Sequence, residues 1–240
     1  MQAWVHAEGR LRLERRPLPE PGPGQVRVRL VTAALNHRDL RLARTRQADR
    51  PVVLGSDGAG ILDQVGPGVD LEAEGLSIGA EVVINPSLHW LDDPEAPPPA
   101  FEILGDPSDG TFAEYVVVPV TNVEPKPPAL SWEEAAAFPL AGLTAYRAVV
   151  TRARVRTGDT VVIPGIGGGV ATFALQIAKA LGARVAVTSR SAVKLERAQA
   201  LGADAGFSSD GPWDEQVRAW TGGRGADVVI ETVGAPTWAR

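Results

Sequence analysis

The 240-residue chain contains no cysteine, which excludes disulfide bonds and any zinc site built on thiolate ligands. Its only histidines are His6, His37 and His89. No apolar run approaches the ~20 residues that a membrane-spanning helix needs, and the N-terminus lacks the apolar segment of a secretory signal. Lysine and arginine are dispersed, and the net charge is −5. These absences argue against a nucleic-acid or membrane partner and favour a cytoplasmic protein that acts on small molecules.

Residues 1–124 have the pattern of a β-rich domain. Polar and apolar residues alternate over 25–35, which is typical of a strand, and short apolar runs bounded by glycine and proline recur. The stretch 92–110 is rich in proline and acidic residues, so we expect an exposed loop. Several short strands between turns predict a barrel-like or sandwich-like domain. The strand-forming segments are 25–35, 51–69, 79–87 and 110–120.

Residues 125–240 have a different pattern, in which strands alternate with helices. Ser131 and Glu134 form the sequence of a capping box and predict the start of a helix. A buried strand is expected over 159–164 and a helix over 170–183, with Gly182 at its end. This alternation predicts a doubly wound parallel sheet of the α/β class. Further expected elements are a strand over 184–189, helices over 192–204 and 213–223, and a strand over 226–234.

The segment 164–171, PGIGGGVA, holds four glycines between a predicted strand and a predicted helix. A helix N-terminus at that place favours a pyrophosphate, because its N–H groups lack backbone partners and glycine permits close approach. The three places of the G-x-G-x-x-G/A fingerprint fall on Ile166, Gly168 and Ala171, with Gly165 one residue before the first. A glycine-rich turn without a ligand is the alternative interpretation.

The end of the next strand indicates which dinucleotide is bound. NAD-binding units carry an acidic residue there, which holds the ribose 2′-hydroxyl. This chain has Ser189 and Arg190 instead, with Lys194 shortly after. A hydroxyl, a guanidinium and an ammonium group suit a 2′-phosphate, so we expect NADP(H) as the cofactor. The alternative is a solvated basic helix start.

Six blocks of the sequence, in order and spacing, resemble the medium-chain dehydrogenase/reductase superfamily, and most closely its zinc-free quinone oxidoreductase and enoyl reductase branches. The resemblance covers the whole chain. It implies a GroES-like β-rich domain followed by a Rossmann domain, with the boundary near residue 124. The blocks are LNHRDL (35–40), VLGSDGAGILDQVGPGV (53–69), GTFAEYVVVP (110–119), LSWEEAAAFPLAGLTAY (130–146), GIGGGVATFALQIAKALGA (165–183) and GADVVIETVG (225–234).

Two departures from the zinc-dependent relatives bear on chemistry. Their Gly-His-Glu block is Gly55-Ser56-Asp57 here, and their zinc-binding cysteine is replaced near Asn36. The stretch 85–109, where their structural zinc lobe falls, has no cysteine. His37 and Asp57 are candidate metal ligands, but no complete ligand set is evident, so we expect no metal. Without a Lewis acid, quinones, enones and enoyl thioesters are favoured over plain alcohols, because hydride transfer to them spreads the negative charge.

The resemblance also implies roles for individual residues. Those expected at the reacting end are Asn36, His37, Asp39 and Arg44; those expected at the cofactor are Thr144, Gly168, Gly169, Val170, Ser189, Arg190, Lys194, Val233 and Gly234. Asn36 and Asp39 have an alternative as turn or cap residues, and Thr144 as a hydroxyl inside a helix. Asp57, between glycines, is interpreted as structural. Tyr146 and His37 are candidate proton donors, with water as the alternative.

The expected function is hydride transfer from NADPH to a quinone or an α,β-unsaturated carbonyl without zinc. The alternatives are an enoyl-thioester reductase, a zinc-type alcohol dehydrogenase-like protein, and a non-catalytic NADP(H)-binding protein. The chain stops just after the fourth strand of the Rossmann domain, and the resemblance implies two more strands and a returning segment. We therefore expect an incomplete domain and weak or absent activity if this chain is the whole protein. A homodimer is the one protein partner that the resemblance suggests.

Overall fold

The computed structural model describes residues 1–47, 50–90 and 95–238. The chain forms two compact units, Met1–Leu140 and Ala141–Arg240. In chain order the first unit contains β1 (Gln2–Ala7), β2 (Arg10–Arg15), β3 (Gln25–Ala34), α1 (His37–Thr45), β4 (Val52–Val53), β5 (Asp57–Val65), β6 (Glu81–Ile84), β7 (Ser87–Leu88), β8 (Glu102–Ile103), β9 (Tyr115–Pro119), the short helix η1 (Val120–Asn122), β10 (Val123–Pro125) and α2 (Trp132–Ala137), and α3 (Pro139–Tyr146) begins at its end.

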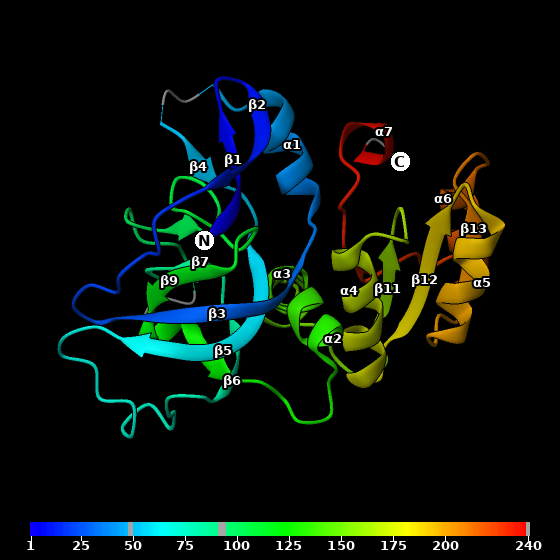
Figure 1. Cartoon of the computed structure of the whole chain (residues 1–240). Helices are drawn as coiled ribbons and strands as arrows, with labels where there is room; N and C mark the ends of the chain where they lie inside the picture. Colours follow the sequence, from blue (N-terminus) through cyan, green and yellow to red (C-terminus); the bar gives the residue numbers. More distant parts are fainter. Residues whose placement is uncertain (48–49, 91–94, 239–240) are drawn as a thin grey trace. The chain divides into compact units, whose positions relative to one another are not determined.

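The main sheet of the first unit is antiparallel, with the strand order β10-β6-β5-β3-β9. Its two longest strands, β3 and β5, run side by side and curve strongly (Figure 1). The register shifts after Arg27 and Leu30, and such bulges increase the bend of a strand. Val26, Val28 and Leu62 are fully buried in the core that this curved sheet encloses. The expectation of a β-rich first domain is thereby confirmed.

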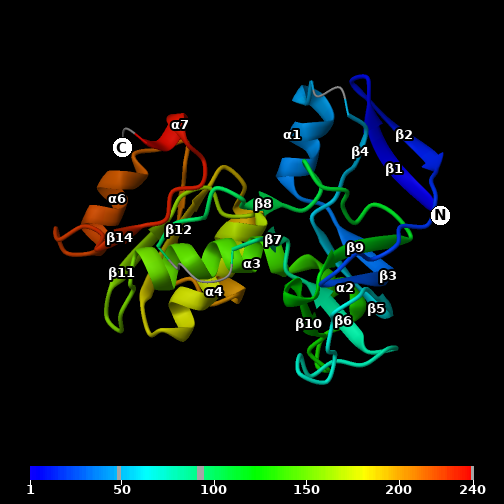
Figure 2. The same ribbon diagram turned by 90° about the vertical axis from the view of Figure 1, so that its left-hand side faces the viewer.

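A smaller sheet at the N-terminus has the order β2-β1-β4. Figure 2 shows the β1–β2 hairpin, with β4 and α1 beside it. Neither the hairpin nor α1 is predicted by the sequence patterns. Every residue of β2 except Glu14 is exposed. Leucines alternate with polar residues in this strand, but they do not form the buried face that such alternation normally indicates.

The division between the units lies sixteen residues after the expected boundary at 124/125, because α2 packs on the sheet of the first unit. Ala135 and Ala136 of this helix are fully buried against Ala59 and Val83. The predicted capping box is present: the Ser131 side chain accepts a hydrogen bond from the Glu134 N–H, and the Glu134 carboxylate accepts one from the Ser131 N–H. The capping box predicts the helix correctly, but a cap does not show which core the helix joins.

The predicted exposed loop 92–110 is wrong in its second half, and residues 92–94 lie outside the described residues. Glu102 and Ile103 form β8, which pairs with β7, and Leu104 is completely buried. The backbone of this segment packs tightly: an added Cβ at Gly110 would lie 1.9 Å from the Gly55 carbonyl oxygen. Composition indicated an exposed loop here, but the packing of its backbone against the Gly55 segment buries part of it.

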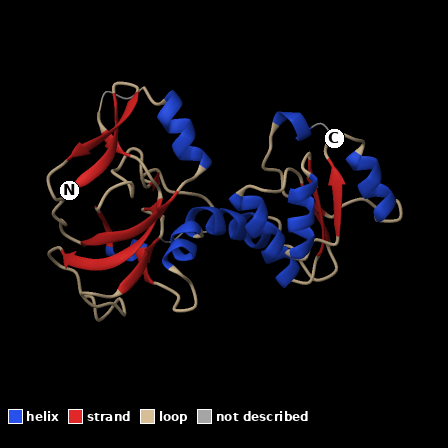
Figure 3. Ribbon diagram, turned by 45° about the vertical axis from the view of Figure 1, so that its right-hand side comes forward, coloured by secondary structure: helices blue, strands red, loops and turns tan. Residues whose placement is uncertain are grey.

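The second unit is built on a parallel sheet with the order β13-β12-β11-β14. Residues of alternating position point to opposite faces: Ile163 and Val187 pack with α4, whereas Val162 and Ala186 pack with α6. Figure 3 shows helices on both sides of these strands, so the predicted doubly wound fold is confirmed. Its elements are the remainder of α3, the π-helical segment η2 (Arg147–Arg152), β11 (Thr160–Ile163), α4 (Gly169–Ala180), β12 (Arg184–Ser189), α5 (Ala192–Ala200), β13 (Ala205–Ser208), α6 (Trp213–Trp220), β14 (Val228–Val229) and α7 (Ala235–Trp238).

The order of these strands locates the binding edge of the sheet. β12 and β13 lie on one side of β11, and β14 lies on the other, so the strand order reverses at β11. In open α/β sheets, ligands bind beyond the carboxyl ends of the strands at such a reversal. The glycine-rich segment follows β11 directly. Among the described residues, no helix is long and apolar enough to cross a membrane.

Candidate functional site

A cavity of about 400 Å³ in the first unit brings together three of the four residues expected at the reacting end. Asn36, His37 and Asp39 line it at the first turn of α1. Arg44 is exposed near the end of the same helix and does not line this cavity. The other lining residues are apolar: Leu11, Leu35, Leu40, Ala43, Leu54 and Phe112.

Asn36 is held by hydrogen bonds on both its backbone and its side chain. It is the N-cap residue of α1, and its backbone N–H donates to the Asp39 carboxylate at 2.7 Å. Its side-chain Nδ2 donates to Oδ2 of Asp57 at 2.9 Å, across 21 positions of sequence. The interpretation of Asn36 as a cap residue is correct, and the side chain also belongs to a buried polar network.

Asp57 is completely buried and accepts hydrogen bonds at both carboxylate oxygens. Oδ2 accepts from Asn36, and Oδ1 accepts from the Leu140 N–H in the first turn of α3 at 2.8 Å. Burial raises the pKa of Asp57 to about 6; the bonds from Asn36 and Leu140 lower it, and the nearby Asp39 raises it again. Burial likewise raises the pKa of Asp39, and the Asn36 N–H and the charge of Arg38 oppose the shift.

The raised pKa predicts how Asp57 changes stability with pH. Because its pKa rises from 3.8 to about 6 on folding, its contribution is fully present below pH 3.8 and is lost as the pH rises through 6. The stability of the wild type relative to Asp57→Asn should therefore fall between pH 4 and 7, by roughly 3 kcal/mol at most. Urea unfolding of both proteins at several pH values measures this difference, and a constant or rising difference contradicts it.

Arg38 belongs to the same first turn of α1 but does not line the cavity. Its guanidinium donates to Oγ of Ser56 at 3.0 Å and to the backbone carbonyls of Leu104 at 3.0 Å and Asp106 at 3.1 Å. Ser56 is fully buried, and its hydroxyl in turn donates to the Leu104 carbonyl at 2.7 Å. The bonds fasten α1 to the segment after β8. Arg38 is part of the LNHRDL block that carries the family resemblance, but the sequence predicts no role for it.

The side chains at this place do not fit a zinc ion. Zinc is bound by thiolate, imidazole and carboxylate groups. Here Ser56 supplies a neutral hydroxyl that is already hydrogen-bonded on both sides, and a permanently charged guanidinium lies against it. Within residues 1–47, 50–90 and 95–238, no group of three or more histidine, aspartate or glutamate side chains is placed to share a metal ion.

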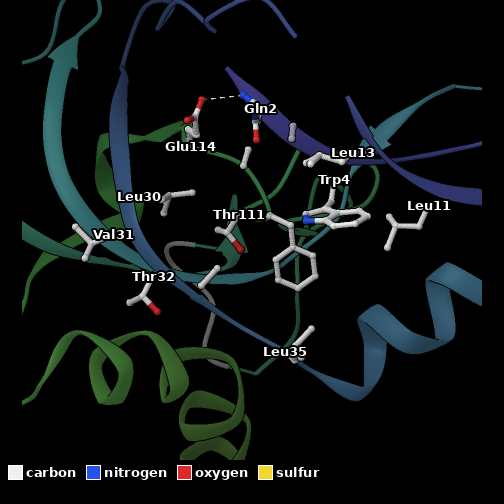
Figure 4. A pocket seen from close by; sticks show the side chains of 14 residues that line it. Gln2, Trp4, Leu11, Leu13, Leu30, Val31, Thr32, Leu35, Thr111 and Glu114 are labelled. Atoms are coloured by element: carbon white, nitrogen blue, oxygen red, sulfur yellow. Dashed lines mark hydrogen bonds between the residues drawn. The ribbon is translucent and has the colours of Figure 1, made fainter. Parts of the chain in front are cut away.

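A larger apolar cavity of about 570 Å³ lies next to this site and shares Leu11, Leu35 and Phe112 with it. Figure 4 shows the Trp4 ring beside Leu11 and Leu13 on one side, and Leu30, Val31 and Thr32 of β3 on the other. Among the residues that the structure describes, no lysine or arginine lines either cavity. The two cavities therefore suit an uncharged, apolar molecule.

In the second unit, the glycine loop is bound to the end of the neighbouring strand. The Gly165 N–H donates to the Thr188 hydroxyl at 3.2 Å, and the Ile166 N–H donates to the Thr188 carbonyl at 2.8 Å. Gly168 is the N-cap of α4, and Gly169 begins the helix. An added Cβ at Gly169 would lie 2.9 Å from the Cβ of Ala141, so this glycine allows α3 and α4 to pack closely.

The basic residues expected at the cofactor lie around this loop. Lys194 crosses over Gly167, since an added Cβ on Gly167 would lie 2.6 Å from Cδ and 3.0 Å from Nζ of Lys194. Ser189 is buried at the end of β12 and accepts a hydrogen bond from the Ser191 N–H, whereas Arg190 is exposed. The hydroxyl of Ser189 is thus used within the turn, and the charges of Arg190 and Lys194 are presented at the carboxyl end of the sheet.

The turn that follows β14 brings Val233 to the glycine loop. An added Cβ at Gly165 would lie 2.3 Å from Cγ2 of Val233, which shows how closely the two segments approach. Glu231, which sequence reasoning missed, holds this turn: its carboxylate accepts hydrogen bonds from the N–H groups of Val233 and Gly234 and from the Thr237 hydroxyl. These bonds lower the pKa of Glu231, although burial opposes the shift most strongly.

The second unit thus gathers Gly168, Gly169, Val170, Ser189, Lys194 and Val233 around one sheet edge. Thr144 lies on α3 and is exposed. The helix N-terminus and the glycines fit a dinucleotide pyrophosphate. Together the units define a two-domain protein with a β-rich cavity domain and a domain of the dinucleotide-binding type.

Comparison with known proteins agrees with this class. Residues 22–128 match the alcohol dehydrogenase GroES-like domain, and residues 169–240 match the zinc-binding dehydrogenase family. A zinc-type alcohol dehydrogenase-like protein of Schizosaccharomyces pombe is 39% identical, over 90% of this chain and 63% of its own length. An NAD-dependent alcohol dehydrogenase of Sulfurisphaera tokodaii is 35% identical, over 92% of this chain and 67% of its own length. The chain belongs to the medium-chain dehydrogenase/reductase superfamily.

Solved structures support the same assignment. The crystal structure of an NAD-dependent alcohol dehydrogenase superposes with a TM-score of 0.88 at 45% identity, covering 98% of this chain and 71% of that chain. A mycobacterial protein crystallised with NADPH superposes with a TM-score of 0.83 at 29% identity, covering 99% and 69%. A crotonyl-CoA reductase of Streptomyces collinus is 30% identical over 95% of this chain and 60% of its own length. Relatives of both cofactor types and several substrate classes are therefore similar to this chain.

Proposed function

We propose that this chain forms the cavity domain and the cofactor domain of a zinc-independent, NADPH-dependent reductase of quinones or α,β-unsaturated carbonyls. The observation that carries the proposal is the hydrogen bond from the Arg38 guanidinium to Ser56, because it places a fixed positive charge where a zinc ligand would have to be. The chain spans 63% of the length of the yeast relative, so activity, substrate and partners belong to this proposal.

The cofactor assignment is supported by the second unit's own side chains. NADPH supplies the hydride when it is bound. The N-terminus of α4 at Gly168 and Gly169 binds its pyrophosphate, and Arg190 and Lys194 bind its 2′-phosphate. β12 ends at Ser189 and Arg190 follows it, so the acidic residue that NAD requires at this place is missing. The relatives that are named as NAD-dependent favour NAD instead. A comparison of NADPH and NADH binding therefore tests the cofactor assignment directly.

In the first unit, the apolar cavity binds the substrate body, and Asn36 faces its carbonyl oxygen. One N–H of the Asn36 amide is used by Asp57, which leaves the second N–H as a donor to the oxygen on which charge develops. His37 is exposed and lines the same cavity, and its imidazole returns the proton. Charge spread over an enolate or hydroquinone needs only such modest donors.

The first experiment measures NADPH oxidation with a quinone and with an enone after exhaustive metal chelation. We expect activity to survive chelation and Asn36→Ala to lower kcat by about 100-fold, as for the loss of one oxyanion donor. Gln64→Ala removes an exposed amide of β5 outside both cavities and is the matched control. Loss of activity on chelation contradicts the zinc-independent mechanism.

An enoyl-thioester reductase is the second candidate, because the crotonyl-CoA reductase is similar over nearly the whole chain. A crotonyl-thioester assay separates the two. We expect the smaller, uncharged acceptors to be preferred, since no lysine or arginine of the described chain lines either cavity of the first unit to receive a phosphorylated carrier. Micromolar NADPH binding without turnover of any acceptor indicates a non-catalytic cofactor-binding protein instead.

A further inference from the structure

The GSDGAG segment contains a buried carboxylate that the proposed reaction does not consume. Asp57 begins β5 and is completely buried. Its backbone carbonyl accepts a hydrogen bond from the Thr111 hydroxyl at 2.8 Å, so the main chain at this residue is fixed as well. An ordinary turn aspartate caps nearby N–H groups within its own turn. Asp57 instead bonds to residues 21 and 83 positions away.

Both oxygens of Asp57 act as acceptors, and the two donors are of different kinds. Asn36 is a side-chain amide that lines the 400 Å³ cavity, whereas Leu140 offers a backbone N–H in the first turn of α3. The first N–H groups of a helix lack partners within the helix, and a carboxylate is a favourable acceptor there. Asp57 therefore ties a cavity residue to the start of a helix.

We infer that Asp57 is a positioning residue that fixes the orientation of the Asn36 amide in the cavity. An amide presents a donor end and an acceptor end, which have nearly the same shape. The carboxylate accepts only from the Nδ2 end, so the amide cannot turn over without losing this bond. The inference rests on the proposed function in one respect: the proposed function has the Asn36 amide donate to the substrate oxygen.

Replacing Asp57 by asparagine changes one acceptor oxygen into a donor group. The new side chain satisfies either Asn36 or Leu140, but its NH₂ then faces the other donor. Asp63→Asn is the matched control: it is the same change on the same strand, at a carboxylate that pairs with Arg27 outside the cavities. Both variants lose one negative charge, but only Asp57→Asn removes an acceptor of the Asn36 amide.

The direct test is the side-chain amide signal of Asn36 in ¹⁵N NMR spectra, assigned by its absence in Asn36→Ala. In the wild type and in Asp63→Asn, we expect a signal that is displaced from the position of a free amide and protected from hydrogen exchange. In Asp57→Asn, we expect the signal to move away from its wild-type position and to exchange fast. An unchanged Asn36 signal in Asp57→Asn overturns the inference. If that variant does not fold, exchange of the wild-type Asn36 amide as fast as a free amide overturns it.

The kinetic test separates this inference from the proposed function. Where the wild type is active, Asp57→Asn should lower kcat about 30-fold with NADPH affinity unchanged, and Asp63→Asn should leave both unchanged. A smaller folded fraction would also lower the apparent kcat without changing NADPH affinity. We therefore express kcat per mole of folded protein, taken from the urea unfolding curves of each variant. If the wild type reduces none of the acceptors, the proposed function fails, and the NMR result still decides whether Asp57 orients Asn36.

Discussion

NADPH binding is expected to weaken about 100-fold when Arg190 and Lys194 are replaced together by alanine, while NADH binding changes little. Both side chains are exposed near the glycine loop, and Lys194 lies over Gly167. Each charge-assisted contact with the 2′-phosphate contributes roughly 1.4 kcal/mol at such exposed positions, which is about tenfold in affinity. Fluorescence titration with both nucleotides measures the change and does not depend on turnover.

The matched control for this double substitution is Arg197→Ala. Arg197 lies on the same helix, α5, but in its last turn. The Arg197→Ala substitution removes a positive charge from this helix but none from beside the glycine loop. Equal weakening by Arg197→Ala would assign the effect to general electrostatics, and equal weakening of NADH would place the two residues at the pyrophosphate. Either outcome contradicts recognition of the 2′-phosphate.

The second large effect is expected at Gly110, where alanine should destabilise the first unit by about 3 kcal/mol or more. An added Cβ would lie 1.9 Å from the Gly55 carbonyl oxygen and 2.7 Å from Cα of Gly105. Both neighbours are backbone atoms, which cannot turn away as a side chain does. This contact holds the segment after β8 against the residues at the start of β5, which include Ser56 and Asp57. Loss of the contact should therefore also disrupt the cavity.

Thermal unfolding measures this prediction, with a fall of about 10 °C or more expected in the midpoint of the first unit. Gly211→Ala is the control, because its nearest neighbour is 3.9 Å away, at ordinary van der Waals contact. It should leave the midpoint nearly unchanged. If Gly110→Ala unfolds at the same temperature as Gly211→Ala, the packing of these backbones is looser than the structure describes.

The residues expected at the cofactor can be predicted from the sequence, because parallel strands bring their carboxyl ends to one edge of the sheet. The segment after β11 and the segment after β12 are each recognisable from local patterns, and their proximity follows from βαβ connectivity. The sequence does not predict the role of Glu231. Its carboxylate holds a turn by accepting from two backbone N–H groups and a hydroxyl, and this arrangement has no distinct sequence pattern.

The reacting end was predicted less completely. The sequence indicates Asn36 and Asp39 as site residues, but it favours a turn role for Asp57 and assigns no role to Arg38. Their roles depend on partners that are distant in sequence. Arg38 donates to the carbonyls of Ile103, Leu104 and Asp106. Asp57 accepts from the Leu140 N–H. Such bonds arise from the curvature of β3 and β5 and from α2 packing on that sheet, which no local pattern encodes.

By itself, the sequence determined the class of each domain, the position of the glycine loop, the basic residues beside it and the absence of thiolate ligands. These are consequences of residue type and period, which act over a few positions of the chain. The tertiary structure alone decided that a guanidinium lies against Ser56, that Asp57 holds Asn36, and that α2 belongs to the first unit. Those facts depend on which distant segments share a buried space, where a charge or a polar group must find its partner.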